Sequence, residues 1–342
     1  MGDSKVELAS RSRRTSETLL QGAIDVHVHA GPHLKSSPRS VNPIEAAIEA
    51  REAGMRAIVL MDVFQMSSGT AWIANRAVEG MDVYGGIILN TCYGGMNPRA
   101  VKTALQYGVD TCRFISFGAH STYHEAVNEG RYEDGEWILL KDRYPDFAEE
   151  ELSRAIRIPG DSVPRELAEI LEIIAENPDI YLVTGHVSAE EGIRLTELAL
   201  EYGISKVLIS DPVVNAMTDE QIEWAIGQGA YIERLLAGHT HTTTIPKTHY
   251  YVEERYRSSS KSKPPTHGPS GVAKVADQIA RFGADKLIIG TDYGVYTLPT
   301  PVEGLREFIA CLMDLGVSTG DIRKVSSINP ARLLGLDIRS PR

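Results

Sequence analysis

Eight short apolar runs alternate with longer amphipathic segments along this chain of 342 residues, and this alternation constrains the fold more than any other feature. Short continuous apolar runs are typical of strands buried on both faces, and the longer segments have helical periodicity. The expected strands are Ala23 to His29, Arg56 to Asp62, Val83 to Leu89, Thr111 to Phe117, Ile180 to His186, Lys206 to Asp211, Tyr231 to Leu236 and Lys286 to Asp292. The expected helices include Pro43 to Ala53, Pro98 to Tyr107, Arg165 to Ala175, Glu190 to Tyr202, Asp219 to Gly227 and Val272 to Phe282. Eight β/α alternations predict an α/β fold, the (β/α)8 TIM barrel.

The barrel is expected to form one domain over residues 21–342, after an N-terminal extension over 1–20. Two long insertions interrupt it, residues 120–163 after the fourth strand and residues 237–270 after the seventh. Both exceed the few residues that usually connect a strand to its helix. Each insertion is a lid over a substrate, a solvated insertion or a contact with another copy of the chain.

Metal-donor side chains stand where four of the expected strands end. His27 and His29 alternate along the first strand, so both side chains are expected to point to one face. His186, Asp211 and Asp292 follow three other apolar runs. An isolated His-x-His pair is more often an ordinary pair of histidines, but the carboxyl ends of barrel strands share one mouth. Nitrogen and carboxylate donors gathered there suit zinc, manganese or iron.

Further side chains near the expected mouth are candidate substrate contacts. Arg113 is suited to binding a carboxylate through two hydrogen bonds, and Glu233 could pair with Arg113 or with a metal-bound histidine. The remaining candidates follow strands four, seven and eight, where surface histidines or packing would give the same pattern: His120, His124, His239, His241 and Tyr293.

Composition narrows the classes of function. A net charge of −11 argues against binding to nucleic acid, because a phosphate backbone needs a basic face. The three cysteines are too few and too widely spaced for a disulfide framework or a cysteine zinc site. No run approaches the roughly 18 apolar residues of a membrane span. We therefore expect a cytoplasmic protein that acts on a small molecule, with no membrane partner. Oligomers are common among barrels of this kind, so we also expect a homo-oligomer.

These residues together resemble the amidohydrolase superfamily. The resemblance is carried by His27-x-His29, by His186, by Thr291-Asp292 and by the C-terminal run Asn329-Pro-Ala-Arg-Leu-Leu-Gly335. Five segments resemble, more narrowly, a branch known mostly as a domain of unknown function: Asp25 to Pro32, Ala53 to Leu60, Gly85 to Asn90, Thr184 to Ser188 and Ala230 to Arg234.

The resemblance implies a metal-dependent hydrolase. His27, His29, His186 and Asp292 would surround a divalent ion, and Asp292 would act as the general base toward a metal-bound water that attacks a small amide, lactone or ester. Zinc is the first expectation for the ion and manganese the second.

The chain departs from the superfamily pattern at three strands. Strand four offers no lysine or acidic residue that could bridge two ions, strand six ends in Asp211 where a histidine is usual, and strand two ends in Leu60-Met-Asp-Val-Phe64 without the lysine and histidine of that branch. These departures favour one ion over two. They leave open a mononuclear lyase or isomerase, such as a decarboxylase, and a barrel that only binds its ligand.

Overall fold

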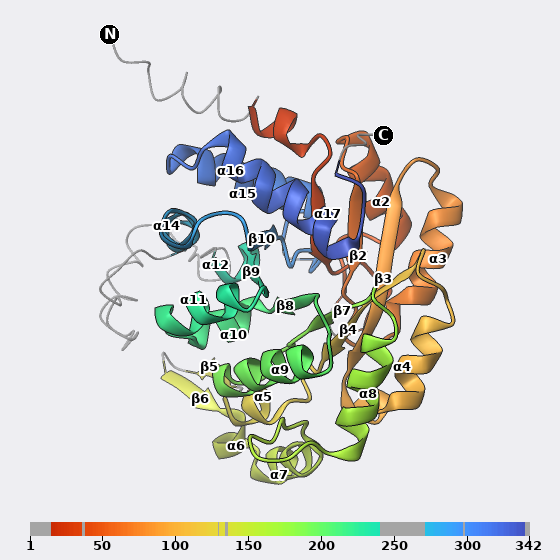
Figure 1. Ribbon diagram of the computed structural model, residues 1–342, viewed down its shortest axis with the longest axis vertical. Coiled ribbons are helices and arrows are strands. Elements are labelled where there is room, and N and C mark those ends of the chain that lie inside the picture. Colours follow the sequence, from red (N-terminus) through yellow and green to blue (C-terminus); the bar gives the residue numbers. More distant parts are fainter. Residues whose placement is uncertain are drawn as a thin grey trace.

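Eight parallel strands form one sheet that curves into a barrel (Figure 1). The computed structural model describes residues 15–35, 38–128, 130–133, 136–239, 271–296 and 298–338. The sheet order is β1-β2-β3-β4-β7-β8-β9-β10. Its strands are β1 (Ile24–Val28), β2 (Ala57–Leu60), β3 (Asp82–Leu89), β4 (Cys112–Phe117), β7 (Tyr181–Val183), β8 (Val207–Ile209), β9 (Tyr231–Leu235) and β10 (Leu287–Gly290). The predicted TIM barrel is confirmed, and every strand falls within its predicted range to within one residue.

Contacts between β1 and the end of β10 close the ring. The amide of Asp292 donates to the carbonyl of His27 at 2.9 Å, and the amide of His29 donates to the carbonyl of Tyr293 at 2.9 Å. Below them, the buried carboxylate of Asp25 accepts hydrogen bonds from the Thr291 amide at 3.1 Å and the Thr291 hydroxyl at 2.6 Å. The closure therefore places the residues after β10 directly beside the two histidines of β1.

Helices surround the barrel (Figure 1). The six predicted helices appear as α2 (Pro43–Glu52), α4 (Pro98–Leu105), α8 (Arg165–Ala175), α9 (Ala189–Glu201), α11 (Asp219–Gly227) and α14 (Val272–Phe282). Further helical segments are α3 (Ser67–Ala77), η1 (Thr91–Tyr93), α10 (Asp211–Ala216), α12 (Leu236–His239), α15 (Pro301–Asp314), α16 (Thr319–Arg323), η3 (Lys324–Ile328) and α17 (Asn329–Leu334). Asn42 caps α2 through a capping box with Glu45, as the Asn-Pro pair at its start indicates.

Two apolar clusters hold the fold. The larger lies between strands and helices. The smaller fills the barrel itself and includes Ile24, Phe114, Tyr181 and Ile288, together with Leu333 of α17. Apolar side chains therefore pack inside the barrel, where the polar residues Asp25 and Glu233 are buried as well.

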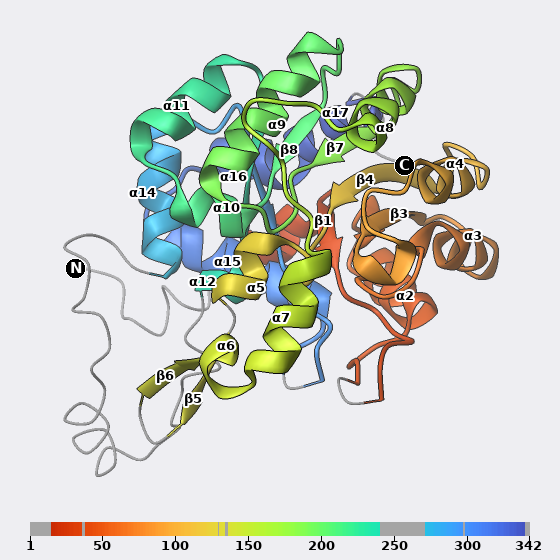
Figure 2. The same cartoon turned by 90° about the horizontal axis from the view of Figure 1, so that it is seen from below.

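The insertion after β4 is a folded unit. It contains α5 (Tyr123–Asn128), the antiparallel hairpin β5 (Gly130–Glu133) and β6 (Glu136–Leu139), α6 (Leu140–Arg143) and α7 (Pro145–Arg154). The hairpin lies at the edge of the molecule in both views (Figures 1 and 2). The insertion joins the body where the Thr122 hydroxyl donates to the carbonyl of His186 at 2.6 Å.

Most of the second predicted insertion, residues 240–270, lies outside the described residues. None of the described helices is long and apolar enough to cross a membrane.

Candidate metal and substrate site

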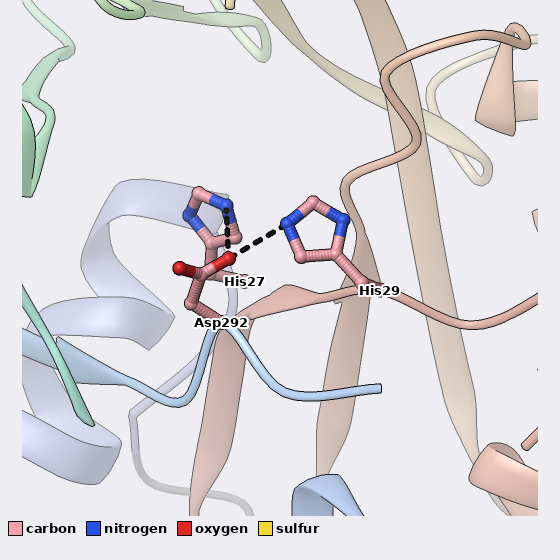
Figure 3. Close-up of side chains that lie close together, drawn as sticks. All are labelled: His27, His29 and Asp292. Carbon is pink, nitrogen blue, oxygen red and sulfur yellow. Dashed lines mark ion pairs between the residues drawn. The ribbon is translucent and has the colours of Figure 1, made fainter. Parts of the chain in front are cut away.

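His27, His29 and Asp292 converge at the C-terminal ends of β1 and β10 (Figure 3). Nε2 of His29 lies 2.7 Å from Oδ1 of Asp292, and Nε2 of His27 lies 3.7 Å from the same oxygen. Among the described residues, these three form the one group whose donor atoms all lie within 4.8 Å of one another and could hold a metal ion. The pairing of β1 with β2 shifts its register between Asp25 and Val28, an irregularity of the kind that re-aims side chains.

Asp292 takes a backbone conformation that few residues adopt. Its φ is +57°, and it is the only residue other than glycine with a positive φ in the described part of the chain. Aspartate tolerates this left-handed region better than most side chains, and such strain concentrates at functional sites. Burial raises the pKa of Asp292, but the hydrogen bond from His29 and the charges of His29, His27 and His186 outweigh it and lower this pKa. Asp292 is therefore ionised at neutral pH.

Glu233 of β9 orients the ring of His27 through a contact with its Nδ1 atom. Its Oε1 lies 3.0 Å from Nδ1 of His27, and its side chain is fully buried. Burial lowers the pKa of His27, but the charge and hydrogen bond of Glu233 and the charge of Asp292 raise it to about 9. The sequence predicted Glu233 as a substrate contact; the structure instead gives it the alternative role, pairing with a histidine.

This arrangement fits a divalent cation. When Glu233 accepts the Nδ1 proton of neutral His27, the ring lone pair remains on Nε2 and faces Oδ1 of Asp292. Two acceptors that face each other repel unless a proton or a metal ion lies between them. A carboxylate that orients a metal-binding histidine through its other nitrogen is a common arrangement around metal ions in proteins.

A cavity of about 710 Å³ opens beside the three residues. Its polar and charged lining consists of His29, His33, Arg39, Thr91, His120, Ser121, Glu151, His186 and Asp292, and its apolar wall includes Phe64, Val295 and Leu298. Ala126, Ala148 and Glu151 come from the insertion after β4, so this insertion forms part of the cavity wall. The volume suits a small molecule.

His186 and His120 lie in this cavity, apart from the three-residue group. His186 Nδ1 lies 3.5 Å from Oε2 of Glu125, a residue that the sequence did not single out. The ring of His120 lies 6.2 Å from that of His186 and stacks on Phe64 at 5.9 Å. Burial and the charge of His186 lower the pKa of His120. His120 is therefore positioned to contact a ligand, whereas His124 hydrogen-bonds Asn128 and does not line the cavity.

Asp211, predicted as a metal ligand, lies in a buried ion-pair network. Its Oδ1 lies 3.3 Å from Nη1 of Arg234 and 3.0 Å from Nε2 of His239, and Oδ1 also accepts the Leu235 amide at 3.1 Å. The Asp-Pro pair starts helix α10 here, and Asp211 is not part of the group of donor atoms formed by His27, His29 and Asp292. The metal-ligand prediction for Asp211 and the substrate prediction for His239 are thus not supported by their positions.

Two further expectations need correction. Arg113 is the second residue of β4 and lies 3.5 Å from Asp179, which precedes β7, so it occupies the end of the barrel opposite the mouth. Tyr293 is fully buried against Gly304 of α15 and forms no cavity wall. His241 lies outside the described residues.

Sequence reasoning also missed His33 and Arg39 of the cavity wall. Both lie in the connection between β1 and α2. A connection that follows a barrel strand lies at the mouth, and this rule could have found them.

Comparisons with known proteins support the fold. An amidohydrolase from Burkholderia multivorans with bound zinc has a TM-score of 0.52 and 10% identity, with 92% of this chain and 99% of that chain covered. The 2,6-dihydroxybenzoate decarboxylase from Rhizobium has a TM-score of 0.50 and 11% identity over the same shares. The resemblance to amidohydrolase barrels is confirmed at the level of the fold. No curated protein matches the chain in sequence, while a family of unknown function, DUF6282, matches residues 22–233.

Proposed function

The chain belongs to the family of unknown function DUF6282, and we propose that it is a metal-dependent hydrolase of the amidohydrolase type, acting on a small amide, lactone or ester. The observation that carries this proposal is the convergence of His27 and His29 on one oxygen of Asp292 at the edge of a cavity. Folding alone does not require three metal-donor side chains in one mouth.

His27, His29 and Asp292 would hold the ion, and His186 is our candidate for a further ligand because it lines the same cavity. Nitrogen donors from histidine favour zinc, with manganese as the second choice. A bound divalent ion supplies a Lewis acid that polarises a carbonyl oxygen and lowers the pKa of water.

Asp292 is the proposed general base. Its Oδ1 faces the two histidines, so Oδ2 is the oxygen that would accept a proton from the attacking water and return it to the leaving group. His27 keeps its orientation through Glu233 during this exchange. His120, an exposed residue that lines the cavity, would contact the substrate.

A mononuclear lyase is the second candidate. One of the proteins that share this fold is a decarboxylase, and a single ion that polarises a carbonyl group serves decarboxylation as well as hydrolysis. The two reactions differ in the product, so a screen of amides, lactones, esters and carboxylates with mass-spectrometric product identification separates them.

The test begins with the metal content. We expect close to one equivalent of zinc or manganese per chain by plasma mass spectrometry, in protein purified without a chelating tag. His29→Ala and Asp292→Asn should lose it, and His186→Ala should bind it more weakly. His124→Ala is the matched control, because His124 does not line the cavity, and it should keep the ion.

Two results would contradict the proposal. Protein that takes up no divalent ion even after incubation with zinc or manganese cannot be this kind of hydrolase. Metal that survives Asp292→Asn and His29→Ala unchanged would place the ion elsewhere. Close to two equivalents would support the hydrolase with a second ion bound near His120, His186 and Glu125.

A further inference from the structure

Arg39 is the only lysine or arginine among the residues that line the cavity in the described part of the chain. Its backbone is held against the segment that follows Asp292. Arg39 forms an antiparallel bridge with Val295, and the Ser40 amide donates to the carbonyl of Gly294 at 2.7 Å. The segment after Asp292 therefore pairs with the backbone of the segment that carries Arg39.

One N–H group of the Arg39 guanidinium has no hydrogen-bond partner among the described residues. Its Nε is buried and has no hydrogen-bond partner among the described residues, and no ion pair is formed with a described carboxylate. The first carbons of its side chain pass close to Gly31, where an added Cβ would lie 3.4 Å from the Arg39 Cβ. A buried N–H without a hydrogen-bond partner is unfavourable unless a ligand or water accepts from it.

The electrostatic setting keeps Arg39 available for an anion. Burial lowers the pKa of Arg39, and the charges of Asp62 and Asp292 oppose this decrease, so the guanidinium stays charged at neutral pH. Asp62 is already engaged, because it accepts the amides of Phe64 and Gln65. Asp292 is engaged by His29. The other acidic group of the lining is Glu151 of α7.

We propose that Arg39 binds a carboxylate of the substrate and so selects anionic substrates for the cavity. This inference rests on the proposed function, in that the cavity beside His27, His29 and Asp292 is taken as the substrate site. It gives to Arg39 the role that the sequence suggested for Arg113, at the end of the barrel where the cavity lies.

The charge balance favours a carboxylate over a phosphate. One guanidinium matches the single charge and planar fork of a carboxylate. A phosphate carries more charge and would face Asp292 and Glu151, with Arg39 as the single lysine or arginine among the described lining residues.

Isothermal titration of the zinc-loaded protein with benzoate, benzamide and phenyl phosphate tests the proposal. We expect Arg39→Gln to weaken benzoate binding at least about tenfold, which corresponds to about 1.4 kcal/mol, and to leave benzamide binding unchanged. Arg39→Lys keeps the charge without the fork and should show a smaller loss. Arg51→Gln, at the exposed end of α2, is the matched control and should bind benzoate like the unchanged protein.

Four results would overturn the inference. They are equal benzoate affinity in Arg39→Gln and the unchanged protein, a loss of the same size in Arg51→Gln, tighter Arg39-dependent binding of phenyl phosphate than of benzoate, and no benzoate binding up to about 10 mM. Circular dichroism of each variant verifies folding. If Arg39→Gln does not fold, the benzoate affinity of Arg39→Lys tests the inference instead.

The same titration in chelator-treated protein separates the two proposals. Benzoate binding that depends on Arg39 in a protein that never takes up zinc would support the inference and contradict the metal-dependent function. Zinc binding together with benzoate binding that substitutions of Arg39 leave unchanged would support the metal-dependent function and contradict the inference about Arg39.

Discussion

Oε1 of Glu233 lies 3.0 Å from Nδ1 of His27, which links the carboxylate of β9 to the histidine of β1 across the barrel interior. The other oxygen of Glu233 accepts the Asp211 amide at 3.4 Å. This contact orients the His27 ring within the three-residue group.

Glu233→Gln should weaken metal binding by about 10- to 100-fold, because a hydrogen bond from a neutral amide orients His27 less firmly and makes its ring less basic. The measurement is competition with a fluorescent chelator. Glu220→Gln, on the exposed face of α11, is the control and should bind metal normally. Unchanged metal affinity in Glu233→Gln would show that Glu233 does not orient His27 for metal binding.

Metal binding should strengthen as pH rises toward about 9. Without metal, His27 has a pKa of about 9, so an incoming ion must displace its proton at neutral pH. Each pH unit below 9 should lower the apparent affinity by up to about tenfold.

The raised pKa of His27 also makes the stability of the metal-free protein depend on pH. Since the pKa of His27 is raised above its usual 6.5, its contribution to stability is complete below about pH 6.5 and is lost as pH rises through 9. Affinity that is flat between pH 7 and 9 would contradict a protonated His27.

Asp211→Asn should destabilise the fold without removing the ion directly. The substitution leaves Arg234, which is fully buried, without its charged partner, and breaking a buried pair in this way costs about 3–5 kcal/mol. Urea unfolding monitored by circular dichroism measures the cost. Loss of the metal at unchanged stability would instead return Asp211 to the ligand set.

Arg113→Met should leave metal content and benzoate affinity within about twofold of the unchanged protein, because its guanidinium lies at the far end of the barrel, 3.5 Å from Asp179. We expect a stability loss of about 1 kcal/mol, since Arg113 also lies over the ring of Tyr84. A large loss of benzoate affinity with normal stability would contradict the roles given to Arg113 and Arg39.

The predicted and observed strands differ mainly in where they end. The apolar run of the fifth predicted strand extends to His186, yet β7 ends at Val183. Gly185 has a φ of +71°, and a Cβ there would overlap the carbonyl of Phe117. The chain leaves the sheet at this close approach, and His186 consequently lies beside Glu125 of the insertion.

The sequence by itself determined the barrel, its strand order and the three donors His27, His29 and Asp292, because apolar periodicity and the residues at strand ends are local properties of the chain. Only the tertiary structure decided which charged groups meet. Arg113 and Arg39 occupy opposite ends of the barrel. Asp211 pairs with Arg234, whereas Glu233 pairs with His27. The pairing of Glu233 with His27 joins residues 206 positions apart, and no local pattern encodes a contact at that separation.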